Sequence, residues 1–345
     1  MANEMPSTRC VSVIMTVKND ALGAETTLSS LLHQTRPPDE IVICDGGSTD
    51  DTRDRLRRWA ALHAHVRVLD APGANIARGR NLAVAASRGD IIASTDAGCR
   101  ADTQWLENLI APFERDPPLE FVAGFYRVDP HSLFERVVGL ATMRGQLAPV
   151  DPQSFNPSAR SLACTRRLWE RVGGFPEWLD FSEDTLFDHK VRRLGAKWTL
   201  VENAVVHWRP RSTWRSLARQ FYAYGTGRGQ TQIDAPSFHY NLRNVVMVFA
   251  AAVLSWINPW FLGLLIAGLL YFYWLPFHAQ AVVIARQTNR PVAYLISLLV
   301  TWTVLFPNLA GYLVGSFRRI RCGRRGRRLM ESYLSDEPVT PAVLS

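Results

Sequence analysis

The sequence predicts an α/β protein with a doubly wound mixed sheet, followed by apolar helices toward the C-terminus. Two observations predict the sheet: short apolar, β-branched runs recur along residues 11–95, and segments of helical length separate them. A third observation predicts the helices, because residues 245–317 contain two long runs without a charged side chain. A chain of 345 residues has room for one large domain with appended elements, or for two domains.

The first part of the chain alternates strand and helix patterns. Because the apolar runs are short and β-branched, we expect buried strands at 11–17, 41–44, 66–69 and 90–95. Helices are expected at 21–33, after the polar stretch 48–51, and at 74–87. Farther along, the patterns predict a helix at 103–113, a strand at 119–128, a helix at 165–173 and a strand at 204–208.

Two of these strands end in a carboxylate. Asp45 ends the second strand and precedes Gly46 and Gly47, and Asp96 ends the fourth strand before Ala97-Gly98. Ligands of open α/β sheets bind at the carboxyl ends of strands, although an aspartate there equally often caps the next turn or helix. The sequence lacks the GxGxxG and GxxxxGK[ST] phosphate-binding motifs. Strand-end carboxylates would therefore have to hold a nucleotide.

Four ordered motifs resemble those of the family 2 glycosyltransferases. They are Val11–Asn19, Pro38–Asp50, Gly79-Arg80-Asn81 and Asp96-Ala97-Gly98, and the resemblance extends over about residues 10–230. It implies the GT-A fold and a nucleotide-sugar donor. By this resemblance Thr16 and Asn19 contact the nucleotide, Asp45 binds its base or ribose, and Arg80, together with Arg78, faces the pyrophosphate. The alternative is that Asp45, Arg78 and Arg80 are capping or surface groups.

The resemblance also implies a divalent cation, Mg²⁺ or Mn²⁺, which would stabilise the charge on the leaving nucleoside diphosphate. Asp96 matches the first acid of the family's DxD motif, but Gly98 stands in place of the second acid. Another ligand would therefore have to complete the site. His207 is the predicted metal ligand, and a structural histidine is the alternative; Asp102 lies nearby in sequence and either binds the metal or caps the next helix.

The pair Glu183-Asp184 follows Gly173-Gly174-Phe175-Pro176 and matches the ED motif of the same family. Transfer with inversion requires one carboxylate to deprotonate the acceptor hydroxyl. We assign that base to Asp184, with Glu183 positioning it or the acceptor. The alternative is structural, because Ser182 can cap a helix and acids in its first turn suit the helix dipole.

Farther along, Arg211 and Arg219 either contact the diphosphate or form a solvated basic face. The QxxRW box of polymer-forming members is absent, which favours addition of a single sugar.

The charge of the chain is concentrated near its C-terminus. The formal net charge is +8, and residues 318–328 hold seven arginines and no acid, whereas the rest is nearly neutral. This distribution argues against a nucleic-acid-binding face. The five cysteines form no CxxC pair and no zinc-like spacing with histidine. The N-terminus has no signal-peptide pattern, so we expect the N-terminal domain to stay in the cytoplasm.

The uncharged runs at 245–277 and 292–317 are each long enough to cross a membrane. Pro259 either kinks one long helix in the first run or lies at the tip of a helical hairpin. The positive-inside rule places the arginine segment in the cytoplasm, so an even number of spans, two, is favoured. We expect a catalytic domain at 1–235, a transmembrane region at 240–317 and a basic cytoplasmic tail at 318–345.

The sequence therefore predicts a multi-pass membrane glycosyltransferase, with a cytoplasmic catalytic domain, that inverts the anomeric centre. Its expected partners are a nucleotide-sugar donor, a lipid-linked or saccharide acceptor and the membrane, and no nucleic acid. The alternatives are a nucleotidyltransferase, which would need a glycine-rich triphosphate loop with a lysine that the sequence lacks, and a catalytically inactive membrane scaffold. An intact Glu183-Asp184 pair disfavours the scaffold.

Overall fold

The computed structural model describes residues 9–143, 150–152 and 155–335. The chain forms two compact units. The first unit comprises residues 1–127, 151–208 and 329–345, and the second comprises 128–150 and 209–328. These bounds differ from those of the expected domains, because helices on both sides of residue 235 pack together within the second unit.

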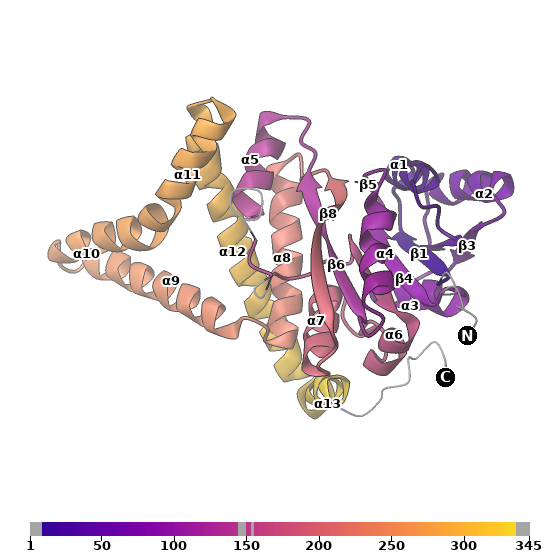
Figure 1. Cartoon of the computed structure of the whole chain (residues 1–345). Coiled ribbons are helices and arrows are strands. Elements are labelled where there is room, and N and C mark those ends of the chain that lie inside the picture. Colours follow the sequence, from indigo (N-terminus) through magenta and orange to yellow (C-terminus); the bar gives the residue numbers. More distant parts are fainter. Residues whose placement is uncertain (1–8, 144–149, 153–154, 336–345) are drawn as a thin grey trace. The chain divides into compact units, whose positions relative to one another are not determined.

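The first unit is built on an eight-stranded mixed sheet (Figure 1). The strand order is β3-β2-β1-β4-β7-β6-β8-β5. β1 pairs in parallel with β2 and β4, and β2 pairs in parallel with β3, whereas β7 pairs antiparallel with β4 and β6. The strands are β1 (Val11–Val17), β2 (Glu40–Asp45), β3 (Val66–Asp70), β4 (Ile91–Asp96), β5 (Cys99–Ala101), β6 (Phe121–Val128), β7 (Leu162–Thr165) and β8 (Trp198–Trp208). The predicted doubly wound mixed sheet is confirmed.

Helices cover both faces of this sheet. On one face Val13 and Met15 of β1 are buried in a cluster with Leu28 of α1 and Leu109 of α4. On the other face Thr16 of β1 faces α3, as described below. The helices are α1 (Ala21–Leu32), α2 (Thr52–Leu62), α3 (Ile76–Ala86), α4 (Trp105–Arg115), α6 (Arg166–Val172) and α7 (Glu183–Arg193), and the last residues of α13 (Gly323–Leu334) also belong to this unit.

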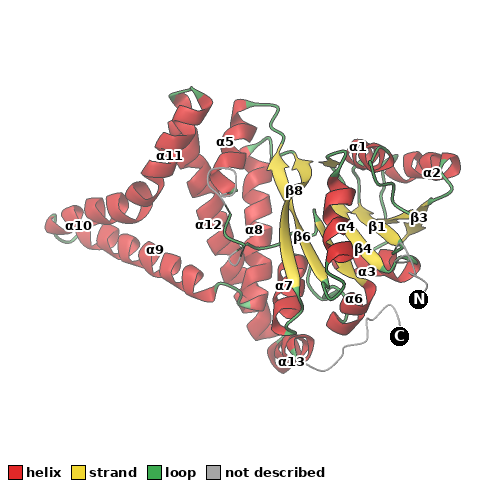
Figure 2. Cartoon of the chain, viewed as in Figure 1, coloured by secondary structure: helices red, strands yellow, loops and turns green. Residues whose placement is uncertain are grey.

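The second unit is helical (Figure 2). Its elements are α5 (Leu133–Thr142), α8 (Trp214–Thr231), α9 (Ala235–Ser255), α10 (Trp260–Gly268), the π-helical segment η2 (Leu269–Trp274), α11 (Leu275–Thr288) and α12 (Val292–Arg321). α8 and α12 approach each other backbone to backbone. A Cβ atom added at Gly225 would lie 2.0 Å from the carbonyl oxygen of Asn308, and one at Gly311 would lie 2.1 Å from that of Tyr222. Glycine is therefore required along this contact.

The first uncharged run is not a single helix. α9 ends at Ser255, α10 begins at Trp260, and Asn258-Pro259 lies in the turn between them. α9 and α10 thus form a helical hairpin with Pro259 at its tip (Figure 1), which was one of the two expected arrangements. α10, η2 and α11 then continue without a break from Trp260 to Thr288.

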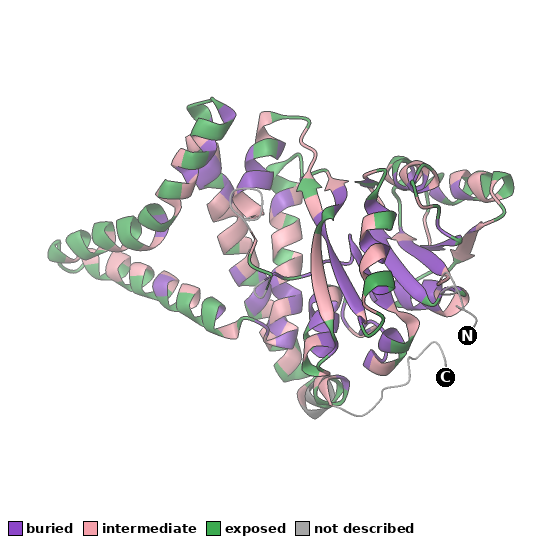
Figure 3. Cartoon of the chain, in the orientation of Figure 1, coloured by how far each residue is buried: buried purple, intermediate pink, exposed green. Residues whose placement is uncertain are grey.

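Two helical stretches of the described chain are long and apolar enough to cross a membrane: Trp260–Thr288 and Val292–Arg321. Each has a mean hydropathy of 1.7. Large apolar side chains on the hairpin and the first stretch are exposed (Figure 3), such as Trp256 at 93%, Trp260 at 87% and Tyr271 at 62%. Soluble proteins rarely expose so much contiguous apolar surface.

Candidate active site

The carboxyl ends of β2, β1 and β4 bring three predicted site residues to one edge of the sheet. In the parallel registers Thr16 pairs with Asp96 of β4, and Val17 pairs with Asp45 of β2. Asp45 and Asp96 therefore lie on either side of the end of β1. Short-range sequence patterns predicted each strand, and the sheet order places the carboxylates together.

Asp45 has one carboxylate oxygen bonded and one available. Its side chain is 1% exposed, and Oδ1 accepts hydrogen bonds from the backbone N–H groups of Gly47 at 2.9 Å and Ser48 at 2.7 Å. The buried Oδ2 has no hydrogen-bond partner among the described residues. A buried acceptor without a partner is costly, so Oδ2 is suited to accept a hydrogen bond from a ligand.

Asn19 and Thr16 lie at the same edge of the sheet, where Asn19 orders the neighbouring loops and Thr16 packs against α3. Asn19 adopts a left-handed backbone conformation with φ at 53°, and its Oδ1 accepts a hydrogen bond from the N–H of Thr49 at 2.7 Å. The Asn19 N–H donates to Ser48 Oγ at 2.9 Å, which ties the loop after β1 to the loop after β2. A Cβ atom at Gly79 would lie 2.9 Å from Thr16 Cγ2. The glycine before Arg80 therefore lets α3 pass close to β1.

Arg80 joins the two predicted halves of the site. Its guanidinium is fully buried and donates through Nη2 to Asp96 Oδ1 at 2.7 Å and through Nη1 to Glu183 Oε1 at 2.6 Å. It also lies 5.3 Å from the centre of the Phe175 ring. The acid at the end of β4 and the acid at the start of α7 are thus held by one cation. The sequence motifs pointed to Arg80 as a pyrophosphate contact and did not reveal this arrangement.

The charges in this cluster shift each other's ionisation. Burial alone would lower the pKa of Arg80, but the carboxylates of Asp96, Glu183 and Asp184 outweigh burial and raise it. Burial, reinforced by the neighbouring Asp184, raises the pKa of Glu183, and Arg80 opposes that increase. The arginine therefore stays charged, and an ionised Glu183 depends on its contact with Arg80.

Asp184 is half-buried at the N-terminus of α7. Its Oδ1 accepts from the N–H of Thr185 at 2.8 Å, and its Oδ2 lies 3.5 Å from the N–H of Ala159. Ser182 occupies the N-cap position with φ at 65°, but its side chain makes no capping hydrogen bond. The capping bond expected of Ser182 is therefore not formed, whereas Glu183 is paired with Arg80 and both acids lie in the first turn of α7, where the helix dipole favours them.

Arg160 is a site residue that the sequence motifs did not indicate. Its Nε lies 3.9 Å from Asp96 Oδ2, and its guanidinium stacks 4.8 Å from the Trp208 ring centre. The guanidinium also lies 5.9 Å from the centre of the Tyr126 ring. Arg160 precedes β7, which pairs with β4, so the mixed part of the sheet brings it to Asp96. No local signal marked it, because it lies outside the four motifs.

The predicted metal ligands are not assembled into a protein-only site. His207 Nε2 lies 2.8 Å from Asp102 Oδ1, across the short β5–β8 ladder in which His207 pairs with Arg100. Asp96 Oδ1 is bonded to Arg80, and Gly98 has φ at 84°, a conformation unfavourable for an acid at that position. Within the described residues no group of three or more His, Cys, Asp or Glu side chains forms a ready metal site.

The remaining predicted contacts are exposed arginines. Arg78 is exposed on the first turns of α3. Arg211 is exposed and belongs to the second unit, where it precedes α8. Their roles toward a diphosphate stay predictions.

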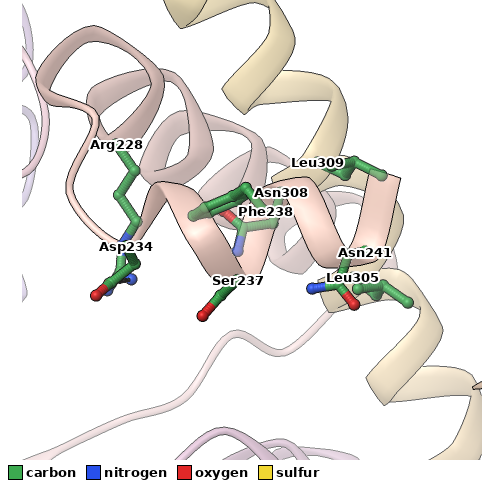
Figure 4. A pocket seen from close by; sticks show the side chains of 8 residues that line it. All are labelled: Arg228, Asp234, Ser237, Phe238, Asn241, Leu305, Asn308 and Leu309. Atoms are coloured by element: carbon green, nitrogen blue, oxygen red, sulfur yellow. Dashed lines mark hydrogen bonds and ion pairs between the residues drawn. The ribbon is translucent and has the colours of Figure 1, made fainter. Parts of the chain in front are cut away.

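The second unit contains a cavity of about 170 Å³ that is lined by residues other than the predicted site residues (Figure 4). It is lined from α8, α9 and α12, and its charged residues are Arg228 and Asp234, which pair with each other. The lining residues are Arg228, Asp234, Ser237, Phe238, Asn241, Leu305, Asn308 and Leu309. None of the predicted site residues lies there, so the strand-end cluster remains the candidate active site.

Comparisons with known proteins show similarity to glycosyltransferases. The model of glycosyl transferase family 2 matches residues 12–161, which contain Asp45, Arg80 and Asp96. Glycosyltransferase AglE of Haloferax volcanii is 26% identical over 237 residues, which cover 65% of this chain and 73% of that protein. The pre-mycofactocin glycosyltransferase of Mycobacterium tuberculosis is 27% identical over 263 residues, 73% of this chain. The chain spans about half of that protein's length, 53%.

A solved structure shares the architecture. The mannosyltransferase PcManGT of Pyrobaculum calidifontis, solved with GDP-Man and Mn²⁺, superposes with a TM-score of 0.57 at 21% identity. The match covers 90% of this chain and 88% of that one. The mixed sheet and these matches lead to one conclusion: the chain has the GT-A fold, and its residues 12–161 match the model of glycosyl transferase family 2.

Proposed function

We propose that the chain is a membrane-bound glycosyltransferase that moves a sugar from a nucleotide-sugar donor to an acceptor hydroxyl with inversion. The observation that carries this proposal is the buried Arg80, which binds both Asp96 and Glu183. Asp96 belongs to the strand edge suited to a nucleotide, and Glu183 is the neighbour of the proposed base. The Arg80 guanidinium therefore holds the carboxylate at the nucleotide edge, Asp96, at a fixed distance from Glu183, which is next to the proposed base.

Asp184 is the proposed general base. It is half-buried, and among the described residues its Oδ2 accepts one long hydrogen bond, of 3.5 Å, from the N–H of Ala159. This oxygen is thus able to take the proton of an acceptor hydroxyl as that hydroxyl attacks the anomeric carbon. Glu183 is bound to Arg80 and cannot easily move, so we assign it to positioning.

The nucleotide-sugar donor would be held by residues at the carboxyl ends of the strands. Asp45 Oδ2 is the buried acceptor for the base or ribose, and Asn19 orders the adjacent loop. Arg160 points its guanidinium toward Asp96, where the diphosphate of a donor would bring negative charge. Arg78 and Arg211 remain candidates for further diphosphate contacts.

A divalent cation fits this site if it arrives with the donor. The ion-pair partner of Asp96 Oδ2 among the described residues is Arg160 Nε at 3.9 Å, and Mg²⁺ or Mn²⁺ commonly binds through one or two carboxylates plus substrate phosphates. Asp96 and His207 are the residues that would hold it. When bound, the cation would neutralise charge on the leaving nucleoside diphosphate. The mannosyltransferase with Mn²⁺ in its structure supports this proposal.

The apolar helices support membrane attachment. Trp260–Thr288 and Val292–Arg321 have the length and hydropathy of membrane spans, and Arg318, Arg319 and Arg321 end the second. Basic residues at that end favour a cytoplasmic C-terminus and catalytic unit. A lipid-linked or other membrane-delivered acceptor would suit an enzyme attached in this way, and a soluble saccharide is the other candidate.

The first experiment is a thermal-shift screen of the full chain in detergent with UDP, GDP, ADP and CDP, each with and without Mn²⁺. One nucleotide should raise the melting temperature, and more so with Mn²⁺, because a ligand that binds only the folded state stabilises it. Asp96→Asn should lose the Mn²⁺-dependent part, whereas Asp116→Asn, a partly exposed carboxylate paired with Lys197, should not. No shift with any nucleotide would contradict the proposal.

A further inference from the structure

Tyr333, near the end of α13, is buried in the first unit. Its side chain is 5% exposed, and its hydroxyl donates a hydrogen bond to the carbonyl oxygen of Gly174 at 2.7 Å. Burial raises the pKa of Tyr333, so the hydroxyl remains protonated and able to donate. The two residues are 159 positions apart, so nothing in the local sequence requires the contact.

The Tyr333 ring makes a second contact, with α7. Lys190 Nζ lies 4.8 Å from the ring centre, and Lys190 is 1% exposed. A desolvated ammonium over an aromatic face is a favourable interaction. Because α7 begins with Glu183 and Asp184, Tyr333 contacts the helix that carries both proposed catalytic carboxylates.

The turn that Tyr333 contacts also holds α3. Gly174 has φ at 73°, and a Cβ atom there would lie 2.7 Å from Asn81 Oδ1. The N–H of Phe175 donates to Asn81 Oδ1 at 2.8 Å, and Asn81 Nδ2 donates back to the carbonyl oxygen of Phe175 at 2.8 Å. Asn81 directly follows Arg80, so this turn sets where α3 places the guanidinium.

The same turn packs against α7. The rings of Phe175 and Phe187 stack with centres 4.5 Å apart, and the Arg80 guanidinium lies 5.3 Å from the centre of the Phe175 ring. The turn therefore lies between the helix of Arg80 and the helix of Glu183-Asp184. Tyr333 is hydrogen-bonded to the turn and packs against Lys190 of α7, so it restricts movement of the turn relative to α7.

We infer that Tyr333 is a positioning residue, which fixes the turn at Gly174-Phe175 against α7 and thereby holds Arg80 and the Glu183-Asp184 pair in register. The inference rests on the proposed function, because the relative position of Arg80 and the Glu183-Asp184 pair affects turnover only if these residues form the active site. The contact itself is independent of the function. The C-terminal end of α13 is thus part of the site's support and not only a basic tail.

The test compares Tyr333→Phe with Tyr240→Phe in the full chain. Tyr333→Phe keeps the ring over Lys190 and removes only the hydroxyl, whereas Tyr240 is 49% exposed on α9 and serves as the matched control. The readouts are kcat and the donor KM, and hydrogen–deuterium exchange of peptides covering residues 173–190. Tyr333→Ala, which also removes the ring, provides a graded second variant.

Tyr333→Phe should lower kcat about 2- to 10-fold, the range for one lost hydrogen bond, and leave the donor KM within about 2-fold. Exchange should accelerate in the turn and the first turn of α7, but not in α1 or α2. Tyr333→Ala should give larger effects in the same places. A purely structural role would instead accelerate exchange throughout the unit. That outcome, or values matching Tyr240→Phe, would overturn the inference.

The two proposals fail in distinguishable ways. If wild-type protein transfers no sugar from any donor, the proposed function fails, and the exchange pattern alone then decides whether Tyr333 holds the turn and α7. If transfer occurs and Tyr333→Phe behaves as the control in both readouts, only the positioning inference fails.

Discussion

At the scale of single residues, the site combines bonded and available oxygens in the same side chains. Asp45 uses Oδ1 to order the loop after β2 and leaves Oδ2 without a partner among the described residues. Asp96 Oδ1 accepts a hydrogen bond from Arg80, and within the described part of the chain its other oxygen forms an ion pair with Arg160 at 3.9 Å. In each case the protein fixes the carboxylate through one oxygen and presents the other.

Asp45→Asn tests this division. The amide oxygen can replace Oδ1 toward Gly47 and Ser48, while an NH₂ group replaces Oδ2. Nucleotide affinity should fall about 10-fold or more, since hydrogen bonds to charged groups contribute roughly 1.5–3 kcal/mol. Isothermal titration with the nucleoside diphosphate found by the screen measures the change. Asp54→Asn, exposed on α2, is the control, and equal affinities of the two variants would refute the assignment.

A second residue-scale prediction concerns Asp188 on α7. Burial raises the pKa of its carboxyl to about 6 from 3.8, although the Arg192 guanidinium at 3.0 Å opposes the shift. Between these two pH values the folded chain binds more protons at Asp188 than the unfolded chain. The free energy of unfolding therefore falls as pH rises through this window, by about 3 kcal/mol in all.

Asp188→Asn should flatten that dependence between pH 4 and pH 6 and should not destabilise the protein at pH 7. Urea unfolding at several pH values gives the comparison, with Asp116→Asn as a control for simple charge removal. A variant that retains the full wild-type slope would show that Asp188 is not its source.

At the scale of elements, local patterns predicted most of the sheet and missed most of the site's internal contacts. The strand at 11–17 has the predicted bounds, because an apolar β-branched run bounded by polar turn residues is a local signal. The ion pair between Arg80 and Glu183 joins residues 103 positions apart, and the hydrogen bond of Tyr333 spans 159. Contacts over such distances depend on the order of the strands, which a single sequence does not specify.

In the helical region, too, local sequence patterns did not specify the final arrangement. The composition of the uncharged run at 245–277 left open a kinked helix or a hairpin at Pro259, and the turn at Asn258-Pro259 divides the run into α9 and α10. His207 had a recognisable position in sequence, but its partner Asp102 is set by the β5–β8 pairing. Motifs thus identified candidate residues, and long-range packing decided what each one touches.

The close contact of α8 and α12 gives an element-scale prediction. Gly225→Ala would place a methyl group 2.0 Å from a backbone oxygen of α12, so the helices must separate. Overpacking of this kind costs about 1–3 kcal/mol. The melting temperature of the detergent-solubilised chain should therefore fall. Gly263→Ala on α10, where nothing lies within 4 Å, is the matched control and should be neutral or slightly stabilising.

At the scale of the whole molecule, the exposed apolar helices require an apolar environment. In the most apolar 18-residue segment of Trp260–Thr288 only 6% of the residues are buried, and so much exposed apolar surface is unfavourable in water. The full chain expressed in cells should therefore remain in the membrane fraction after washing at high salt and at alkaline pH. Release into the soluble fraction by either wash would contradict the proposed spans.

Asp184 is proposed to remove a proton from the acceptor hydroxyl during sugar transfer. The most direct measurement compares wild-type protein and Asp184→Asn for transfer of a labelled sugar, together with the dissociation constant of the nucleoside diphosphate. We expect kcat to fall at least about 100-fold, as for the loss of a general base, and the dissociation constant to change less than about 2-fold. Turnover of Asp184→Asn at the wild-type rate would contradict this proposal.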